Sequence, residues 1–348
     1  MNAIDLFCGA GGLTLGLKQA GFRVLAGIDI DSVAIETYRA NHPDVAFVIE
    51  EDIRKIVPEE VMRDLVLRPG ELDLLAGCPP CQGFSTLRTR KKASVADDGR
   101  NDLVFEYLRF VVALLPKAVM LENVPGLASD TRAESLLARL GELGYVVTDD
   151  TVRIEDAADY GVPQRRKRMI MLATRFGAVK TNAEKKRRVT VRRAFSAAGL
   201  ARPGMSGDPL HDYTVRRSEK VMSIIRAIPK NGGSRTDLPE HLQLPCHRRY
   251  PDGFRDVYGR MSWDDVAPTI TGGCVSPSKG RFVHPEENRA ITLREAALLQ
   301  TFPKNYWFSM RGGRDNTALL IGNALPPEFI RRHAMAIRKI LERHDQRR

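Results

Sequence analysis

The sequence predicts an α/β protein with a doubly wound, mostly parallel sheet and a second, smaller domain that is rich in loops. In the first half, short apolar runs of strand length alternate with segments whose apolar residues follow a helical period. Such alternation is typical of a parallel sheet covered by helices on both faces. After about Arg175 the alternation stops, and residues 176–285 are rich in Gly, Pro, Arg and Ser with frequent turn signals.

The expected elements follow one another in a regular order. We expect strands in the apolar runs 3–7, 22–29, 45–50, 72–77, 117–122 and 168–175. We expect helices at 11–21, 32–43, 102–115, 131–144, 292–302 and 326–344. In the last helix Ile330, Ala334, Ile337 and Leu341 fall on one face, and two prolines stand at its start. Residues 176–285 are expected to form short strands and long loops.

The chain is strongly basic. Its 54 Lys and Arg exceed its 43 Asp and Glu, giving a formal net charge of +11. The basic residues gather in clusters at 88–92, 164–168, 185–193 and 247–250. Any one cluster is equally well explained as solvated surface, but four clusters favour a polyanionic partner, most simply nucleic acid.

The composition disfavours other functional classes. The most apolar stretch, 107–121, is interrupted by Arg109, Pro116 and Lys117, so we expect no membrane span. Asp5 stands where a signal peptide would be apolar, so export is not expected. The five cysteines lack the spacing of a disulfide framework, which suits a reducing cytoplasm.

Unusual residues fall where the expected strands end. Two segments lie at such strand ends, FCGAGG (7–12) and GCPPCQ (77–82). The same holds for the carboxylates Asp29 and Asp52 and for the pair Glu122-Asn123. In a doubly wound sheet these strand ends face one crevice, where ligands bind.

The glycine-rich turn is by itself a weak signal. Thr14 interrupts a strict G-x-G-x-x-G pattern, so a plain tight turn is an open alternative. Asp29 lies 18 residues after Gly11, the place of a carboxylate that binds the ribose of a nucleoside cofactor. This spacing favours a nucleoside cofactor.

Residues 77–85 read GCPPCQGFS, with Cys78 and Cys81 at a C-x-x-C spacing. Zinc would need two more ligands, and the remaining cysteines offer no second such spacing, so no metal is expected. A redox dithiol would normally open a helix, whereas this pair follows a strand. A small buried thiol with a coincidental spacing fits Cys78, and we expect its replacement by Ala to preserve most activity.

Cys81 and Glu122 form a coherent catalytic pair. A thiolate at Cys81 would meet a carboxyl group that arrives from the next strand. Carbon 5 of cytosine becomes nucleophilic enough to accept a methyl group only after a thiolate adds to carbon 6 and an acid assists at ring nitrogen 3. The sequence thus offers a soft nucleophile, an acid and a place for a sulfonium methyl donor with an adenosine body.

The chain resembles the DNA cytosine carbon-5 methyltransferases over nearly its full length. The matching segments, in the family's order, are DLFCGAGG (5–12), GCPPCQGFS (77–85), ENVPG (122–126), QRRKR (164–168), TLREAALLQTFP (292–303) and GNALPP (322–327). One such motif would be weak, but six in order are very specific. The resemblance implies a Rossmann-like fold, S-adenosyl-L-methionine as methyl donor and S-adenosyl-L-homocysteine as product.

The resemblance also implies a role for each matching residue. Cys81 would be the nucleophile, Glu122 would contact ring nitrogen 3 and the exocyclic amine, and Asn123 would brace the catalytic loop. Arg166 and Arg168 would hold the base and the catalytic groups. The residues implied for the cofactor are Phe7, Gly9, Gly11, Gly12, Asp29, Ile30, Asp52, Ile53, Pro80, Leu103, Asn323 and Ala324. Among these, Phe7 and Asp52 would contact the adenine and Asp29 the ribose, while Ile30 stands where some members carry an aromatic residue.

The family further implies that the target cytosine is rotated out of the duplex. We expect the basic loop 82–101 to close over the DNA, with a disordered linker as the open alternative. The DNA contacts expected are Ser85, Arg88, Arg90, Lys91, Lys92 and Gln164.

By this resemblance, residues 1–175 completed by 318–348 would form the catalytic domain, and 176–317 the target-recognition domain. Duplex DNA is the expected substrate, the enzyme would be a cytoplasmic monomer, and a cognate restriction endonuclease would act separately. A transfer-RNA cytosine-5 methyltransferase and a catalytically silent DNA-binding relative are the alternatives. A nicotinamide oxidoreductase would explain only the first two strands.

Overall fold

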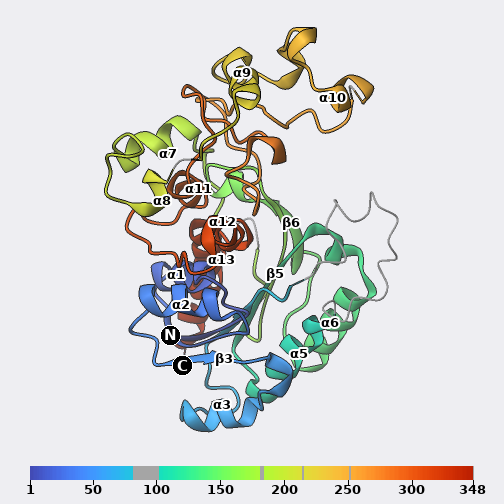
Figure 1. Cartoon of the computed structure of the whole chain (residues 1–348). Helices are drawn as coiled ribbons and strands as arrows, with labels where there is room; N and C mark the ends of the chain where they lie inside the picture. The colour runs from blue at the N-terminus through green and yellow to red at the C-terminus, as the bar shows by residue number, and fades with distance from the viewer. Residues whose placement is uncertain (81–101, 181–183, 214, 251, 348) are drawn as a thin grey trace. The chain divides into compact units, whose positions relative to one another are not determined.

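The computed structural model describes residues 1–80, 102–180, 184–213, 215–250 and 252–347. They form two compact units (Figure 1). The first unit comprises Met1–Tyr160, Lys167–Lys186 and Leu325–Arg348, and the second comprises Gly161–Arg166 and Arg187–Ala324. The first unit is therefore assembled from both ends of the chain.

The first unit is built on a seven-stranded sheet with the order β3-β2-β1-β4-β5-β7-β6. The strands are β1 (Asn2–Leu6), β2 (Arg23–Asp29), β3 (Phe47–Glu50), β4 (Leu74–Gly77), β5 (Ala118–Asn123), β6 (Val152–Asp156) and β7 (Lys167–Thr174). The strands β3, β2, β1, β4 and β5 pair in parallel, whereas β7 is antiparallel to both of its neighbours. The predicted mostly parallel, doubly wound sheet is confirmed.

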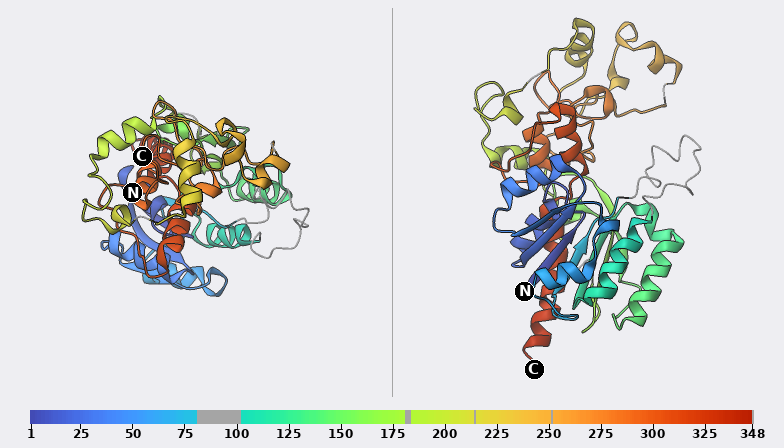
Figure 2. Two further views of the ribbon diagram at one scale, coloured as in Figure 1. Left: turned by 45° about the horizontal axis from the view of Figure 1, so that its top comes forward. Right: turned by 60° about the horizontal axis from the view of Figure 1, so that its bottom comes forward.

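Helices cover both faces of this sheet (Figures 1 and 2). One face carries α1 (Gly12–Gln19), α2 (Ser32–Asn41) and the last helix, α13 (Pro327–Asp345). The other face carries α3 (Pro58–Asp64), α5 (Leu103–Leu114) and α6 (Thr131–Glu142). Within α5, Tyr107, Phe110 and Leu114 are buried at helical spacing, and the Tyr107 hydroxyl donates to the Leu75 carbonyl at 3.1 Å. The Tyr107 hydroxyl group thus has a hydrogen-bond partner inside the apolar core, as a buried polar group requires.

The helix α13 packs against α1 and also contacts β7. Its predicted apolar face is buried, because Ile330, Ala334, Ile337 and Leu341 are each at most 1% exposed. Gly16 of α1 permits a close approach: a Cβ atom there would lie 2.6 Å from the Ile330 Cβ and 2.6 Å from the Pro327 carbonyl oxygen. A residue with a side chain at this position would have to push the two helices apart.

The second unit contains helices and irregular segments. Its helices are α7 (Val191–Ala198), α8 (Pro209–Asp212), α9 (Glu219–Ala227), α10 (Pro245–Arg249), α11 (Leu293–Leu299) and α12 (Gly313–Asn323). Strand-like pairing within its described residues is limited to isolated bridges such as Arg260 with Val283. The expectation of short strands at 176–285 is therefore wrong, because the many prolines and glycines there favour turns over a continuous ladder.

A buried guanidinium ties the loops of the second unit together. Arg260 is 0% exposed and donates to the backbone carbonyls of Ile225, Ile228, His284 and Glu287 over 2.7–3.0 Å. Its last contact is a hydrogen bond to the Asn288 side chain. The five donors of one Arg side chain thereby satisfy carbonyls that a sheet would otherwise have paired.

Within the described part of the chain, none of the helices has the length and apolar character that crossing a membrane demands. The same residues include no group of three or more His, Cys, Asp or Glu side chains arranged to hold a metal ion.

We expect Gly16→Ala to destabilise the protein by about 1–3 kcal/mol, because the added methyl group overpacks the contact between α1 and α13. The measurement is the free energy of unfolding in urea. Gly141→Ala in α6 is the matched control, since a Cβ atom there meets nothing within 4 Å. Relief of helical glycine entropy should leave the control neutral or about 0.5–1 kcal/mol more stable. Equal changes in the two variants would contradict the packing argument.

Candidate active site

The carboxyl ends of five parallel strands lie at one edge of the sheet, as expected. In strand order this edge carries Asp52 after β3, Asp29 on β2, Phe7 after β1, Cys78 after β4 and Glu122 on β5. The residues that the sequence predicted to share a crevice are thus held by neighbouring strands of one unit.

The turn between β1 and α1 has an unusual backbone. Phe7, Gly9 and Gly11 have φ angles of 61°, 51° and 88°, in the left-handed region that favours glycine. Phe7 holds such a conformation with a bulky side chain, which stores backbone strain of a kind that gathers at ligand sites. A Cβ atom at Gly9 would meet nothing within 4 Å, so the turn borders open space. Gly12 begins α1.

Asp29 closes this turn. Its Oδ2 accepts a hydrogen bond from the Gly9 N–H at 2.8 Å, and its Oδ1 accepts one from the Asp31 N–H at 2.9 Å. Burial raises the pKa of Asp29, and these backbone donors oppose the shift. The carboxyl group is therefore fixed at the mouth of the glycine-rich turn.

A buried network that the sequence did not reveal supports the same turn. The Thr14 hydroxyl donates to Asp5 Oδ2 at 2.7 Å and lies 2.8 Å from the Tyr38 hydroxyl. Burial raises the pKa of Asp5 to about 8, and its Oδ1 has no hydrogen-bond partner among the described residues. Thr14, which departs from the strict glycine pattern, thus connects β1, α1 and α2 beneath the turn.

The other residues expected near the cofactor differ in their surroundings. The Asp52 carboxylate caps the 3-10 helix η1 (Ile53–Lys55) and pairs with the Arg54 guanidinium, which lowers the pKa of Asp52 to about 2. Ile53 is buried, whereas Ile30 is 66% exposed and offers an apolar surface. Pro80 is exposed after β4, and Leu103 begins α5.

Glu122 is almost fully buried, with 1% of the residue exposed. The Cys78 thiol donates to its Oε2 at 3.0 Å. The Arg168 Nε lies 3.0 Å from its Oε1, but the N–H does not align for a hydrogen bond. Oε1 therefore has a charged neighbour and accepts no hydrogen bond from the described residues.

The contact between Cys78 and Glu122 corrects the expectation for this cysteine. The sequence favours a small buried thiol with a coincidental spacing, whereas Cys78 is half-buried and its thiol donates to the Glu122 carboxyl group. Sequence reasoning placed Glu122 on the neighbouring strand but missed this contact, because the direction in which the Cys78 side chain points is set by the folded backbone.

Asn123 braces the chain that leaves β4. Its Nδ2 donates to the Pro79 carbonyl at 3.0 Å, while its Oδ1 accepts the Val124 N–H at 2.8 Å. The amide is 4% exposed. It links the end of β5 to the segment that leads toward Cys81.

Four of the expected site residues belong to the second unit. Arg166 is 3% exposed and donates to the carbonyls of Ile270 and Gly322, both at 3.0 Å. Asn323 is exposed at the end of α12, and Ala324 follows it.

Gln164 is the fourth, and it is 0% exposed. Its amide donates to Leu299 and Gln300 and accepts the Ile270 N–H. Both ends of the amide are used within the protein, so the expected DNA contact at Gln164 has no support.

The remaining expected residues, Cys81, Ser85, Arg88, Arg90, Lys91 and Lys92, lie outside the described residues.

The fold and the strand-end residues define the class of a Rossmann-like, S-adenosylmethionine-dependent methyltransferase. A solved structure of a prophage-encoded DNA modification methyltransferase from E. coli is similar to this chain, with a TM-score of 0.69 and 25% identity, covering 98% of this chain and 99% of the other. A methyltransferase structure from Entamoeba histolytica shares the fold at a TM-score of 0.66 and 16% identity, covering 98% of each chain.

The chain belongs to the C-5 cytosine-specific DNA methylase family, whose model matches residues 1–339. It is 36% identical to the type II methylase M.HgiDII of Herpetosiphon aurantiacus, across 97% of this chain and 95% of the relative. It is 34% identical to the type II methyltransferase M1.HphI of Haemophilus parahaemolyticus, across 98% of this chain and 87% of the relative. The protein is thus a DNA cytosine-5 methyltransferase that acts on duplex DNA.

We expect the raised pKa of Asp5 to make folding less favourable as pH rises. In the folded protein the group keeps its proton up to about pH 8, whereas in the unfolded chain it loses the proton near 3.8. Between pH 5 and 7 this difference lowers the free energy of unfolding by about 1.4 kcal/mol per pH unit. Asp5→Asn, which cannot ionise, should remove that slope in urea unfolding measured at pH 5, 6 and 7.

Asp44→Asn is the control for this measurement, because the Lys18 ammonium lowers the pKa of Asp44. Removal of the Asp44 carboxylate should leave the change in unfolding free energy with pH between pH 5 and 7 as it is in the wild type. A wild-type slope that persists in Asp5→Asn would refute a protonated Asp5 in the folded protein.

Proposed function

We propose that the enzyme methylates a cytosine rotated out of the duplex, through a covalent bond between the Cys81 sulfur and carbon 6, with Glu122 assisting at ring nitrogen 3. The observation that carries this proposal is the state of Glu122. Its carboxyl is almost fully buried and paired with Arg168, yet Oε1 accepts no hydrogen bond from the described residues. A buried acceptor without a donor is costly, so the exocyclic amine of a cytosine, which can donate, is favoured at Oε1, and this contact brings ring nitrogen 3 beside the same carboxyl group.

The reaction needs a temporary change in the electronic structure of cytosine. When the Cys81 thiolate attacks, a bond forms between sulfur and carbon 6, and the electron pair of the 5,6 double bond makes carbon 5 an enamine carbon. Glu122 stabilises this state by donating to or protonating ring nitrogen 3. After methylation, loss of the proton from carbon 5 restores the double bond as the sulfur–carbon bond breaks, which regenerates the thiolate.

The carboxyl group of Glu122 must keep one orientation to serve nitrogen 3. The Arg168 guanidinium at Oε1 and the Cys78 thiol at Oε2 hold it from two sides. We assign Cys78 as a positioning residue for Glu122. Asn123, through its hydrogen bond to the Pro79 carbonyl, fixes the start of the segment that carries Cys81.

The cofactor residues fit an adenosine-bearing sulfonium. S-adenosylmethionine supplies the methyl group when bound, and leaves as S-adenosylhomocysteine. The open space at Gly9 lets the chain approach a ligand closely, Asp29 presents a carboxyl group for ribose hydroxyls, and exposed Ile30 offers apolar contact. The proposed cofactor-binding residues also include Phe7, Gly11, Gly12, Asp52, Ile53, Pro80, Leu103, Asn323 and Ala324.

The relatives suggest a wider biological setting. M.HgiDII and M1.HphI are type II enzymes, so we infer that this protein belongs to a restriction-modification system with a separate endonuclease. A cytoplasmic monomer acting on cellular DNA fits this role. The second unit would recognise the target sequence.

The mechanism predicts that Cys81→Ser loses at least about 1,000-fold in the rate of methyl transfer, because a hydroxyl is a far weaker nucleophile than a thiolate. Transfer from labelled S-adenosylmethionine is measured on duplex DNA and on transfer RNA. With methyl donor present, a duplex that contains 5-fluorocytosine should trap a covalent adduct with the wild type, because fluorine replaces the carbon 5 proton and cannot leave as that proton does.

Each arm of this experiment can overturn the proposal. Full activity of Cys81→Ser would exclude the covalent route. Transfer to RNA alone would favour the alternative of a transfer-RNA enzyme, and DNA binding without any transfer would favour a silent relative.

The Cys78 contact predicts that Cys78→Ala lowers kcat about tenfold, whereas the sequence alone predicts that this variant keeps most of its activity. Loss of a hydrogen bond to a charged group is worth about 1.5–3 kcal/mol. Cys78→Ser, whose hydroxyl can still donate to Glu122, should recover most of the rate. Cys246→Ala, at an exposed thiol of the second unit, is the control. Equal rates for the Ala and Ser variants would contradict a positioning role.

A further inference from the structure

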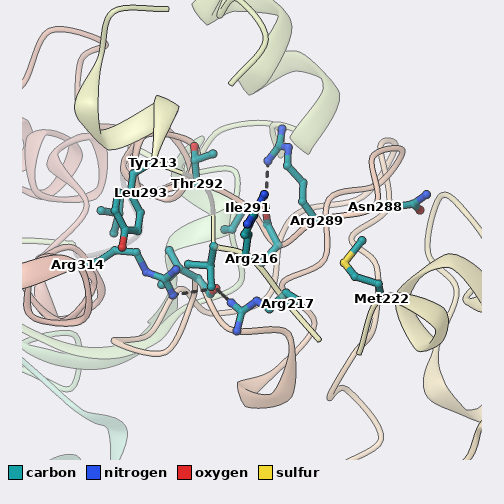
Figure 3. A pocket seen from close by; sticks show the side chains of 13 residues that line it. Tyr213, Arg216, Arg217, Met222, Asn288, Arg289, Ile291, Thr292, Leu293 and Arg314 are labelled. Carbon is teal, nitrogen blue, oxygen red and sulfur yellow. Dashed lines mark hydrogen bonds between the residues drawn. The ribbon is translucent and has the colours of Figure 1, made fainter. Parts of the chain in front are cut away.

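A pocket of about 310 Å³ lies within the second unit, and none of its described lining residues is among those expected to bind the cofactor, the target base or DNA (Figure 3). Four segments form it: the chain from α8 into the start of α9, the loop at Val275, the chain that enters α11, and the first turn of α12. Its cationic lining consists of Arg216, Arg217, Arg289 and Arg314, and none of the described lining residues is acidic.

Two of these guanidiniums converge on one acceptor. Arg217 Nη2 lies 3.0 Å and Arg314 Nη2 lies 3.4 Å from the carbonyl oxygen of Val275 (Figure 3). No carboxylate of the described residues lies within ion-pair distance of Arg217. Burial lowers the pKa of Arg217, and the positive charge of Arg314 adds to this shift. Two like charges therefore share a single neutral acceptor.

The other charged residues in and near the pocket do not neutralise the positive charge of Arg217 and Arg314. Asp315 lies 3.6 Å from Arg314, but its side chain is 94% exposed, so solvent screens the interaction. Arg289, by contrast, is fully paired, because both oxygens of Glu295 lie 2.7 Å from its guanidinium. Arg216 is exposed and makes no hydrogen bond or ion pair with the described residues. The uncompensated charges are those of Arg216, Arg217 and Arg314.

A bound anion would neutralise the positive charge of these arginines and accept hydrogen bonds from their guanidinium groups. Guanidinium groups present donors in a planar fork that matches phosphate oxygens, and the pairing is strongest where water is partly excluded. Tyr213, Met222 and Ile291 add apolar surface to the same pocket, which suits the sugar beside a phosphodiester.

The recessed position of the pair favours a phosphate over a base edge. An arginine that reads guanine must reach outward into the major groove with both donors free. The Arg314 side chain is only 15% exposed, and one Nη2 donor of each guanidinium is already given to Val275. A backbone phosphate projects from the surface of the duplex and can enter a concave site.

We propose that the pocket lined by Arg216, Arg217 and Arg314 binds a backbone phosphate of the DNA substrate. This inference rests on the action of the enzyme on duplex DNA and is independent of the covalent mechanism. The site positions the duplex and carries no sequence information.

The test is DNA binding by fluorescence anisotropy without methyl donor, over 50–200 mM KCl, on two duplexes of unrelated sequence. Arg217→Gln with Arg314→Gln should weaken binding about tenfold on both duplexes alike. The slope of log affinity against log salt should fall by about one, since one phosphate contact is lost. Arg217→Lys with Arg314→Lys keeps the charge and should retain the slope.

The charge-matched control for the double variant is Arg343→Gln with Arg347→Gln, which removes two positive charges at and just after the end of α13. If the double variant fails to fold, Arg216→Gln provides the test, because this exposed side chain has no described partner to lose. It should lower the salt slope by a smaller amount, and Arg343→Gln should leave it unchanged.

Several outcomes would overturn the proposal. An unchanged salt slope would exclude a phosphate contact, and bisulfite sequencing that shows altered target sites in Arg217→Gln would indicate base reading. Inorganic phosphate distinguishes a free anion from DNA. If phosphate raises the Tm of the wild type but not of the double variant while DNA binding is equal in both, the pocket serves a small anion. Because binding is measured without methyl donor, failure of the covalent mechanism would leave these results unaffected.

Discussion

The antiparallel insertion of β7 beside β5 is the constraint on which the site depends. Glu122 lies near the carboxyl end of β5, where an isolated buried carboxylate would be costly. Because β7 runs in the opposite direction, its first residues reach the same edge, and Arg168 comes within 3.0 Å of Glu122. A parallel strand would have placed its last residues, and not Arg168, at this edge.

The order of the strands separates the proposed methyl donor from the acid. The glycine-rich turn follows β1, Glu122 lies on β5, and β4 stands between them. Neighbouring strands are about 4.8 Å apart, so the two groups are held roughly 10 Å from one another across the sheet. The segment that carries the proposed nucleophile leaves β4 in this interval, with Cys78 and Asn123 fixing its first residues. The topology therefore brings the segment out between the donor and the acid.

Arginine side chains have a different structural role in the second unit. It has little regular pairing among its described residues, and Arg260 satisfies buried carbonyls in place of a sheet. Arg217 and Arg314, in contrast, share one carbonyl and keep their charge uncompensated. One guanidinium thus holds the loops together, while others remain available for an anion. The net charge of +11 does not distinguish these uses, since both contribute equally to it.

The sequence by itself determined the α/β class, the strand ends at which unusual residues gather, and the buried face of the last helix. These follow from local periodicity, because the spacing of apolar residues fixes which side of an element is buried. It did not reveal that Cys78 contacts Glu122, that Gln164 is fully buried, or that helices replace the expected short strands of the second unit. Only the tertiary structure decided these points, because the partner of a polar side chain depends on which distant segments adjoin and in which direction they run.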